Sequence, residues 1–201
     1  MSVSVSGIIG AGKTTLVTGL AEELGWPIAK EPMDERGYLP LFYADPARWA
    51  FPFQVEMLTE RFQCYRSALA QGSNTLIDRS VFEDPVFANT LADSNMISAV
   101  EITTYCKLFD LLRSQVQPID LFVYLDVKPE VALERIATRD RKYEKGIDLQ
   151  YLGDLKRGYE SWLESLVGTR IMRLDWNTIK PDAAHTVAHR IRTTLGLQLD
   201  S

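Results

Sequence analysis

The stretch that most constrains this chain is residues 7–15, which read G-I-I-G-A-G-K-T-T. They fit the pattern G-x-x-x-x-G-K-[ST], with Gly7, Gly12, Lys13 and Thr14 at its fixed positions. Glycines let backbone N–H groups surround a phosphate, because no Cβ blocks the approach. In such a loop the Lys13 ammonium contacts the β- and γ-phosphates, and the Thr14 hydroxyl binds Mg²⁺. The stretch therefore predicts a phosphate-binding loop between a strand and a helix.

Segments typical of strands alternate with segments typical of helices along the chain. This alternation predicts an α/β fold in which helices flank both faces of a parallel five-stranded sheet. The 201 residues are enough for a single domain over residues 1–201. Residues 33–52 contain three prolines and are expected to form a loop with at most short helical pieces. We expect strands at about 2–6, 27–30, 75–78, 119–125 and 170–174, and helices at about 14–24, 53–71, 82–92, 97–116, 129–139, 149–166 and 182–195.

The amino-acid composition limits the kinds of partner that this protein is expected to bind. A net charge of −5 and a sequence pI near 5.1 argue against a nucleic-acid-binding surface, which needs clustered lysine and arginine. The sequence has no signal peptide and no run of 18 apolar residues, so we expect a cytoplasmic protein with no membrane partner. Cys64 and Cys106 match no metal or redox spacing, which favours reduced core residues over a disulfide.

Three carboxylates stand where predicted strands end: Glu31, Asp78 and Asp126. In a parallel sheet, ligands gather at the carboxyl ends of the strands. Phosphoryl transfer needs Mg²⁺ ligands, positive charge on the phosphate oxygens and a carboxylate that orients the attacking hydroxyl. Glu31 and the pair Asp78-Arg79 could supply these groups. Asp126 resembles a Walker B residue, but Asp78 competes for that role and a structural cap is the favoured reading of Asp126.

Three arginines lead into a charged segment. Arg135 and Arg139 are four residues apart on one helix face, and Arg141 follows within R-D-R-K-Y-E-K. We expect a lid at about residues 139–147 whose charge stabilises the transferring phosphoryl group. The alternative is a solvated helix end, where cations favour the C-terminal dipole.

Two polar side chains share a face of the long helix predicted over 53–71. Gln54 and Arg61 are seven residues apart and suit the edge of a base, although an exposed polar face is the favoured interpretation from spacing alone. His185 and His189 have a spacing that can bind metal, but no third ligand is evident and solvated residues are favoured.

Taken together, these motifs resemble the deoxynucleoside kinase family, which is a family of P-loop kinases. The resemblance runs from Ser2 to about Leu166 and rests on G-I-I-G-A-G-K-T-T, K-E-P, A-D-P-A-R-W-A-F-P-F-Q, D-R-S-V-F-E-D and R-I-A-T-R-D-R-K-Y-E. It implies an ATP-dependent enzyme that phosphorylates the 5′-OH of a deoxynucleoside in nucleotide salvage. The chain departs from the family where it reads E-P-M-D-E-R-G, since family members often have E-P-V and then a tryptophan.

The resemblance implies roles for the sugar and the reacting groups. Glu31, of the E-P pair, corresponds to the general base, and Arg79, of D-R-S, assists it and the phosphates. Tyr43 and the lid residue Glu144 correspond to the residues that hold the sugar 3′-OH.

The resemblance also implies a base pocket. Phe53 stacks in it, Phe87 faces it and Gln54 binds the base edge. Arg61 and Asp84 stand where family members that accept purines and cytosine carry their arginine and aspartate, so we expect a preference for purines, with deoxyadenosine first, or for deoxycytidine.

These arguments give the complete set of expected site residues. Catalysis is expected of Lys13, Glu31, Arg79, Arg139 and Arg141. Binding of ATP is expected of Gly7, Gly10, Ala11, Gly12, Lys13, Thr14, Thr15, Arg135, Arg139 and Asp175. Binding of the deoxynucleoside is expected of Glu31, Tyr43, Phe53, Gln54, Arg61, Arg79, Asp84, Phe87 and Glu144, and binding of Mg²⁺ of Thr14, Glu31 and Asp78.

Two other functions stay open. A nucleoside monophosphate kinase of the thymidylate kinase type would need more cations near residues 31–54, where only Arg36 and Arg48 are available. A GTP-binding switch protein would use the D-x-x-G match at 34–37, but the chain has no N-K-x-D guanine motif. The family resemblance further suggests a homodimer formed through the helices around 53–71 and 97–116.

Overall fold

The computed structural model describes residues 1–32, 37–70, 72, 74–141, 144 and 146–197. Parallel strands form a five-stranded sheet in the order β2-β3-β1-β4-β5, which confirms the predicted α/β architecture. The strands are β1 (Ser2–Ser6), β2 (Ile28–Ala29), β3 (Thr75–Asp78), β4 (Leu121–Asp126) and β5 (Ile171–Asp175). The helices are α1 (Lys13–Leu24), α2 (Tyr38–Ala44), α3 (Pro46–Ala70), the 3-10 helix η1 (Val81–Glu83), α4 (Asp84–Asp93), α5 (Ala99–Arg113), α6 (Pro129–Arg139), α7 (Leu149–Ser165) and α8 (Ala183–Leu195).

β1 lies at the centre of the sheet, and all five of its residues are buried. Its register places Val5 beside Asp78 of β3 and beside Val123 of β4. Since the strands are parallel, the ends of β1, β3 and β4 lie at one edge of the sheet. This edge carries the loop that follows β1 and the polar residues that follow β3.

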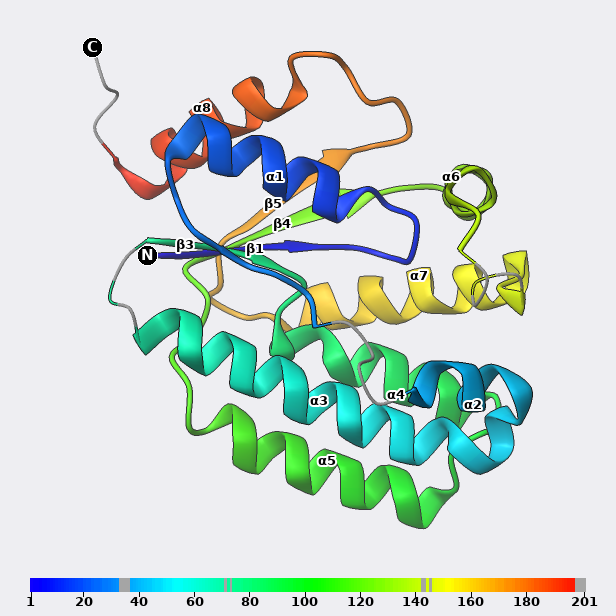
Figure 1. The fold of residues 1–201 in the computed structure, drawn as a ribbon. Coiled ribbons are helices and arrows are strands. Elements are labelled where there is room, and N and C mark those ends of the chain that lie inside the picture. Colours follow the sequence, from blue (N-terminus) through cyan, green and yellow to red (C-terminus); the bar gives the residue numbers. More distant parts are fainter. Residues whose placement is uncertain (33–36, 71, 73, 142–143, 145, 198–201) are drawn as a thin grey trace.

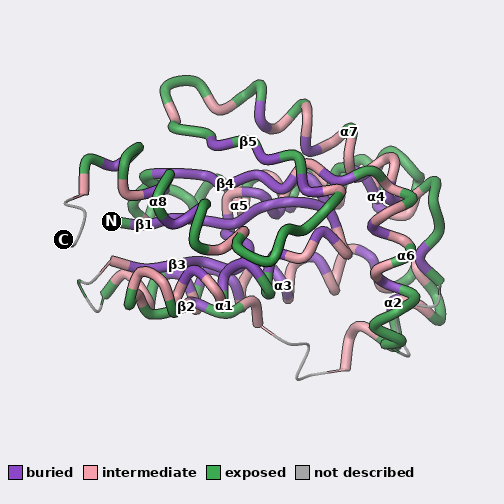
Figure 2. The backbone as a smooth tube through the Cα atoms, turned by 90° about the horizontal axis from the view of Figure 1, so that it is seen from above, coloured by how far each residue is buried: buried purple, intermediate pink, exposed green. Residues whose placement is uncertain are grey.

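The helices cover both faces of the sheet. Figure 1 shows α1 and α8 on one face and α3, α4, α5 and α7 on the other. β1, β3 and β4 are buried along most of their length, whereas the edge strand β5 and the helices alternate between buried and exposed residues (Figure 2). One core cluster includes Leu16, Leu125 and Tyr159, and a second includes Leu58 and Phe122. The sheet therefore has a hydrophobic layer on each side, as in other α/β folds.

The start of α3 differs from the prediction. The helix begins at Pro46, seven residues before the expected Phe53, and it continues through Pro52. Asp45 caps its first turn by accepting a hydrogen bond from Arg48 N at 3.3 Å, and Pro46 suits the first helical position because it needs no N–H partner there. The predicted loop of residues 33–52 was therefore wrong beyond Asp45, while α2 is one of the short helical pieces expected within it.

The other elements agree with the predicted ones to within a few residues at each end. Over the part of the chain that the structure describes, no helix has the length and apolar character needed to cross a lipid bilayer.

Candidate active site

The phosphate-binding loop connects β1 to α1 and packs tightly against α6. Gly10 has a φ of +79°, and a Cβ at this position would lie 2.5 Å from the carbonyl oxygen of Ala132 and 2.9 Å from Ile136 Cγ1. Only glycine fits both the left-handed backbone and this close approach. The loop is thus held between the end of the central strand and the helix that leads to the predicted lid.

Lys13 points into this loop. Its Nζ donates to the carbonyl oxygens of Gly7 and Ile8, each at 2.9 Å, and only 7% of the residue is exposed. Burial, together with the nearby Arg79, lowers the pKa of Lys13 to about 8. The residue therefore stands where its motif predicts, with its ammonium inside the loop.

Thr14 and Asp78 meet at the edge of the sheet. The Thr14 hydroxyl donates to Asp78 Oδ2 at 2.6 Å, and Asp78 Oδ1 is buried with no hydrogen-bond partner among the described residues. Burial raises the pKa of Asp78, although Thr14 and Lys13 oppose the shift. No cluster of three or more histidine, cysteine or acidic side chains suited to a metal ion occurs in the described parts of the chain. A hydroxyl and one carboxylate fit Mg²⁺, which takes oxygen ligands and often binds one or two carboxylates together with substrate phosphates.

Glu31 follows β2 and lies between two guanidinium groups. Its Oε1 is 2.9 Å from Arg61 Nη2 and 2.8 Å from Arg79 Nε. Burial alone would raise the pKa of Glu31, but the charges of Arg79 and Arg61 outweigh it and lower the pKa to about 2. The carboxylate is therefore ionised at every physiological pH. Its expected contact with Mg²⁺ stays a prediction, and the two ion pairs favour a role at the acceptor hydroxyl.

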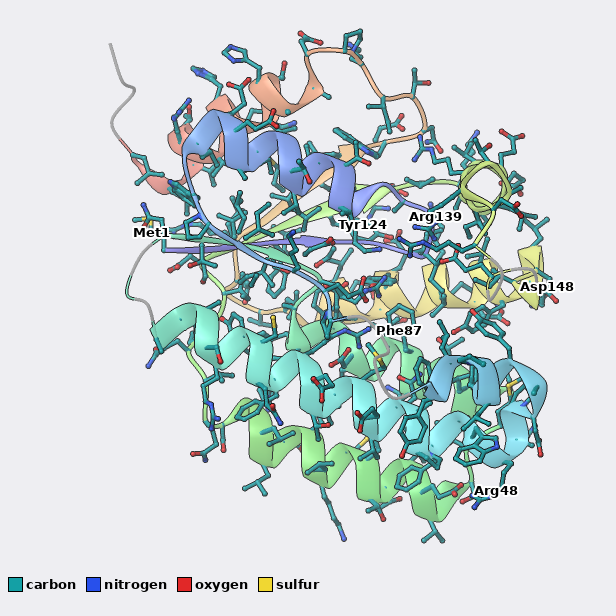
Figure 3. The ribbon with its side chains drawn as sticks, in the orientation of Figure 1. Met1, Arg48, Phe87, Tyr124, Arg139 and Asp148 are labelled. Atoms are coloured by element: carbon teal, nitrogen blue, oxygen red, sulfur yellow. The ribbon has the colours of Figure 1, made fainter. Side chains whose placement is uncertain are left out.

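Arg79 follows β3 with a left-handed backbone, φ 65°, which is uncommon outside glycine. Its guanidinium carbon lies 4.4 Å from the centre of the Phe87 ring, and the residue is only 5% exposed. Figure 3 shows Phe87 between the sheet and α3, on the side of the helices that would line a base pocket. Arg79 and Phe87, which were both expected at the substrate, therefore lie in contact, and their roles there stay predictions.

Gln54 and Arg61 lie on the buried side of α3, so the interpretation of an exposed polar face was wrong. Gln54 is 4% exposed and Arg61 is 8% exposed. Arg61 Nη1 donates to Asp84 Oδ1, and Asp84 is completely buried at the start of α4. Phe53, which was expected to stack on the base, stacks on Phe42 with ring centres 5.2 Å apart.

Two polar atoms of the Arg61–Asp84 pair remain unpaired. Among the described residues, neither Arg61 Nε nor Asp84 Oδ2 has a hydrogen-bond partner, and both atoms are buried. Burial raises the pKa of Asp84 to about 7, against the opposing charges of Arg61 and Arg79. A buried donor and a buried acceptor without partners suit a ligand that offers both groups.

The lid arginines form contacts of their own. Arg139 donates to both carboxylate oxygens of Glu144, at 3.1 and 2.5 Å, and Arg141 lies 3.7 Å from the same carboxylate. Tyr43 is close enough for burial and the Glu144 charge to raise its pKa to about 12, so the two residues expected to hold the sugar 3′-OH lie near each other. The lid residues 142, 143 and 145 lie outside the described residues, as do residues 34–36 of the D-x-x-G match, including Arg36.

Arg135 binds backbone near the loop. Its guanidinium donates to the carbonyl oxygens of Ala11 at 3.1 Å, Trp176 at 2.7 Å and Asn177 at 3.1 Å. It thus connects the phosphate-binding loop to the segment after β5, and its direct contact with ATP stays a prediction. Asp175 is exposed and accepts from Asn177 N and Nδ2, so its predicted contact with ATP also stays a prediction.

Several other residues have structural contacts. Asp126 pairs with Lys156 at 2.6 Å and with Arg173 at 2.7 Å, in agreement with the structural interpretation of this carboxylate. His185 Nδ1 lies 3.0 Å from Glu23 Oε2. Cys64 and Cys106 are both free thiols, as expected, but each is half-buried and not a core residue.

Sequence reasoning missed two buried residues next to Arg79. Glu83 and Tyr159 are both 0% exposed, and the Tyr159 hydroxyl joins Glu83 to Arg79. The pattern S-x-x-E at 80–83 is a capping-box signal that could have identified Glu83 as structurally engaged. Tyr159 carries no local signal, since its partners are 76 and 80 residues away in the chain.

Comparison with known proteins places this site in a family. The family model described as deoxynucleoside kinase matches residues 3–195. The chain is 38% identical over 176 residues to deoxyadenosine kinase of Dictyostelium discoideum, covering 87% of this chain and 72% of that protein. It is 33% identical over 175 residues to deoxyadenosine/deoxycytidine kinase of Bacillus subtilis, covering 86% of this chain and 81% of that protein.

Solved structures agree with the sequence comparison. Deoxyadenosine kinase from M. mycoides with bound dCTP superposes with a TM-score of 0.86 at 26% identity, over 96% of this chain and 100% of that chain. The resemblance expected from the motifs is thereby confirmed, in preference to the two alternative functions. The chain therefore belongs to the deoxynucleoside kinase family, whose members transfer a phosphoryl group from ATP to a deoxynucleoside.

Proposed function

We propose that this enzyme phosphorylates the 5′-OH of deoxynucleosides, with deoxyadenosine preferred, deoxycytidine and deoxyguanosine behind it and thymidine last. The observation that carries the proposal is the buried Arg61–Asp84 pair, whose donor Nε and acceptor Oδ2 have no hydrogen-bond partner among the described residues. An adenine or cytosine amino group can donate to Asp84, and the neighbouring ring nitrogen can accept from Arg61. Relatives named deoxyadenosine kinase and deoxyadenosine/deoxycytidine kinase support the same order.

Thymine fits this pair poorly. Its O4 is an acceptor where Asp84 needs a donor, and its 5-methyl group would desolvate the Arg61 guanidinium without replacing the lost hydrogen bonds. A site that hydrogen-bonds its substrate discriminates strongly against an analogue that leaves buried polar atoms unpaired.

In the proposed reaction, the Glu31 carboxylate accepts a hydrogen bond from the 5′-OH and orients it toward the γ-phosphorus. Because the pKa of Glu31 is about 2, the carboxylate is a weak base, so orientation matters more than early removal of the proton. Lys13 and Arg79 place positive charge beside the phosphate oxygens.

The remaining groups complete the proposed site. Mg²⁺, held by Thr14 and Asp78, would neutralise charge on the phosphates. Tyr43 and Glu144 hold the sugar 3′-OH, and Arg139 and Arg141 of the lid contact the phosphates when the lid closes.

The base proposal is tested with the double variant Arg61→Met/Asp84→Ala. We expect kcat/KM of the wild-type enzyme to be highest for deoxyadenosine and lowest for thymidine, and the variant to shift toward thymidine. The matched control, Arg157→Met/Asp154→Ala, removes an Arg–Asp pair that is half-buried to exposed on α7 and should leave the order unchanged. A wild-type enzyme that phosphorylates thymidine better than deoxyadenosine would contradict the assigned roles.

We also propose that the enzyme is a cytoplasmic homodimer. The helices first expected at the interface include α5, where Val100 is 78% exposed and Leu111 is 62% exposed. A second candidate face is the groove of about 740 Å³ between α4, α5 and α7, which reaches the side chains of Phe109 and Trp162. Light scattering of Leu111→Asp and of Ser161→Arg, a substitution in the groove, would show which face the dimer uses; a wild-type monomer would refute the dimer itself.

A further inference from the structure

The Tyr159 hydroxyl lies between the guanidinium of Arg79 and the carboxylate of Glu83. Arg79 Nη1 donates to the hydroxyl oxygen over 2.9 Å, and the hydroxyl donates to Glu83 Oε2 over 2.5 Å. A phenol has a single proton, so a hydroxyl that accepts from Arg79 can donate only to Glu83. The two hydrogen bonds therefore have a fixed direction, from guanidinium through hydroxyl to carboxylate.

Glu83 is fixed at its other oxygen as well. Its Oε1 accepts from Ser6 Oγ and from Ser80 N, each at 3.0 Å. The carboxylate thus receives three hydrogen bonds and donates none, although burial raises its pKa. Because Ser6 ends β1 and Ser80 follows β3, Glu83 joins the two strand ends that carry the site.

The ring of Tyr159 is fixed by aromatic neighbours. Its centre lies 6.1 Å from that of Phe87, 5.7 Å from Tyr124 and 5.9 Å from Trp162. Figure 3 shows Phe87 and Tyr124 on either side of the space between sheet and helices. Tyr159 belongs to α7, which begins at Leu149 directly after the lid segment. One helix therefore connects the lid to the contact with Arg79.

Arg79 needs such an anchor. Its φ of 65° is uncommon for a residue other than glycine, and its guanidinium is held by contacts with Glu31, Tyr159 and Phe87. Nε lies 2.8 Å from Glu31 Oε1 as an ion pair but makes no hydrogen bond among the described residues, whereas Nη1 donates to the Tyr159 hydroxyl at 2.9 Å. Loss of the second contact would leave the guanidinium held by the Glu31 ion pair and the Phe87 ring, so that its terminal nitrogens could shift relative to the acceptor hydroxyl.

We propose that Glu83 and Tyr159 are positioning residues for phosphoryl transfer, which hold the Arg79 guanidinium against Glu31. The inference rests on the role proposed above for Arg79. Glu83 orients the Tyr159 hydroxyl, and Tyr159 in turn orients Arg79, so neither residue needs to touch the substrate.

The experiment compares two nearly isosteric variants. Tyr159→Phe removes the hydroxyl. Glu83→Gln replaces a carboxylate, whose two oxygens accept three hydrogen bonds, by an amide with one acceptor oxygen and one donor NH2 group. In both variants we expect kcat at saturating ATP and deoxyadenosine to fall by about 10- to 100-fold, because a displacement of about 1 Å can cost that much. KM for either substrate should change by less than about threefold, since the Arg79 contact matters in the transition state.

Tyr124→Phe is the matched control. Tyr124 is 0% exposed beside Tyr159, and among the described residues its hydroxyl has no hydrogen-bond partner. The control therefore removes a buried hydroxyl without affecting Arg79, and kcat should stay within about twofold of the wild type. Assays are run well below the melting temperature of each variant, so that loss of stability does not lower kcat.

Double variants separate this inference from the proposed function. If Tyr159 acts through Arg79, adding Tyr159→Phe to Arg79→Lys should lower kcat by less than about twofold further. For the same reason, the kcat of Tyr159→Phe/Glu83→Gln should equal that of Tyr159→Phe. Wild-type kcat in Arg79→Lys would refute the role of Arg79 itself. The positioning role would be overturned if kcat were low in Arg79→Lys but equal to the wild type in both Tyr159→Phe and Glu83→Gln. It would also be overturned if the losses of kcat in the double variants were fully additive.

Discussion

At the scale of single residues, the site is organised around Glu31 and its two guanidinium partners. The pair Arg61 and Arg79 keeps the carboxylate ionised and points it toward one place. Arg61 uses its other terminal nitrogen to hold Asp84 in the proposed base pocket. The proposed positions of the acceptor hydroxyl and of the base are thus joined by a single connected set of charges.

Glu31→Gln should lower kcat by about 10² to 10⁴, the range typical of a group that transfers or orients a proton. KM for deoxyadenosine should change much less, because the amide still fills the same volume. Steady-state kinetics at saturating ATP measure both constants. An unchanged kcat with a raised KM would show that Glu31 only binds substrate and that another carboxylate orients the hydroxyl.

The same ion pairs predict how stability depends on pH. The folded-state pKa of Glu31, about 2, lies below the ordinary value of 4.5, so the ionised carboxylate stabilises the fold above pH 4.5 and this contribution is lost as the pH falls toward 2. From pH 6 to pH 3 the free energy of unfolding should fall by about 1–2 kcal/mol more in the wild type than in Glu31→Gln. Urea denaturation of both proteins at each pH tests this. Parallel pH curves would show that Glu31 is not stabilised by its arginines.

The phosphate-binding loop and the position of Glu31 after β2 could be predicted from the residues alone, whereas only the family resemblance brought Arg61 and Asp84 together. Residues 7–15 form one contiguous motif, and Glu31, Asp78 and Arg79 follow strands that the sequence already indicated. Gln54 and Arg61 seemed suited to solvent from spacing alone, because Asp84, the buried partner of Arg61, comes from another helix. Tyr159 was missed since hydrogen bonds to residues 76 and 80 positions away leave no local pattern.

At the scale of helices and strands, close packing between α1 and α8 holds the helix that begins at the phosphate-binding loop. Gly19 lies inside α1, and a Cβ there would be 2.7 Å from the Cβ of Ala184 in α8. A glycine inside a helix normally costs about 1 kcal/mol relative to alanine, so its presence here allows the two helices to approach.

Gly19→Ala should therefore destabilise the protein by about 1–3 kcal/mol despite the better helix propensity, because the added methyl group overpacks the interface. The double variant Gly19→Ala/Ala184→Gly should recover much of this loss by exchanging the small residue between the helices. Thermal unfolding in the absence of ligand measures both. If Gly19→Ala were more stable than the wild type, the contact between α1 and α8 would be looser than described.

The lid segment is an element in which charge matters more than packing. Arg139 is bound to Glu144 at the surface, with 37% of its side chain exposed. Exposed pairs of this kind contribute about 0–1 kcal/mol, so their loss should hardly change the free energy of unfolding.

Arg139→Ala and Arg141→Ala should lower kcat and weaken ATP binding while leaving the melting temperature without ligand within a few degrees of the wild type. Arg190→Ala, an exposed arginine of α8, is the control and should change neither property. A large fall in the melting temperature without ligand would favour the alternative in which these arginines only stabilise the end of α6.

Element boundaries show why the sequence predicted most of this architecture and missed part of it. Short apolar segments that alternate with helical segments identified the strands. Gly25 marked the end of one helix, and Pro129 marked the start of another. The start of α3 was missed because Pro52 was taken as a helix breaker, whereas the capped first turn at Asp45 and Pro46 lets the helix begin earlier. Local signals such as proline therefore mark a helix boundary reliably only when tertiary packing does not compensate for them.

At the scale of the whole molecule, the two proposed ligand sites use different layers of the fold. The ATP site is formed where β1 meets α1, whereas the base site lies between α3 and α4 on the other face of the sheet. Glu31, Asp78 and Arg79 lie between them at the sheet edge. Each ligand should therefore stabilise the fold on its own, through different residues.

Saturating ATP or deoxyadenosine should each raise the melting temperature. Ligand at 100 times its Kd adds about 2.7 kcal/mol to stability, and for a domain of 150–250 residues 1 kcal/mol corresponds to about 2–4 °C, so a shift of about 5–10 °C is expected. In Lys13→Ala the shift with ATP should largely disappear while the shift with deoxyadenosine remains, because Lys13 lies in the phosphate-binding loop and not in the proposed base pocket. Arg61→Met/Asp84→Ala should show the reverse, and thymidine should stabilise it more than it stabilises the wild type. Differential scanning fluorimetry measures the melting temperature of each of the three proteins with each ligand. Loss of both shifts in either variant would contradict separate sites and indicate that the charges at the sheet edge couple them.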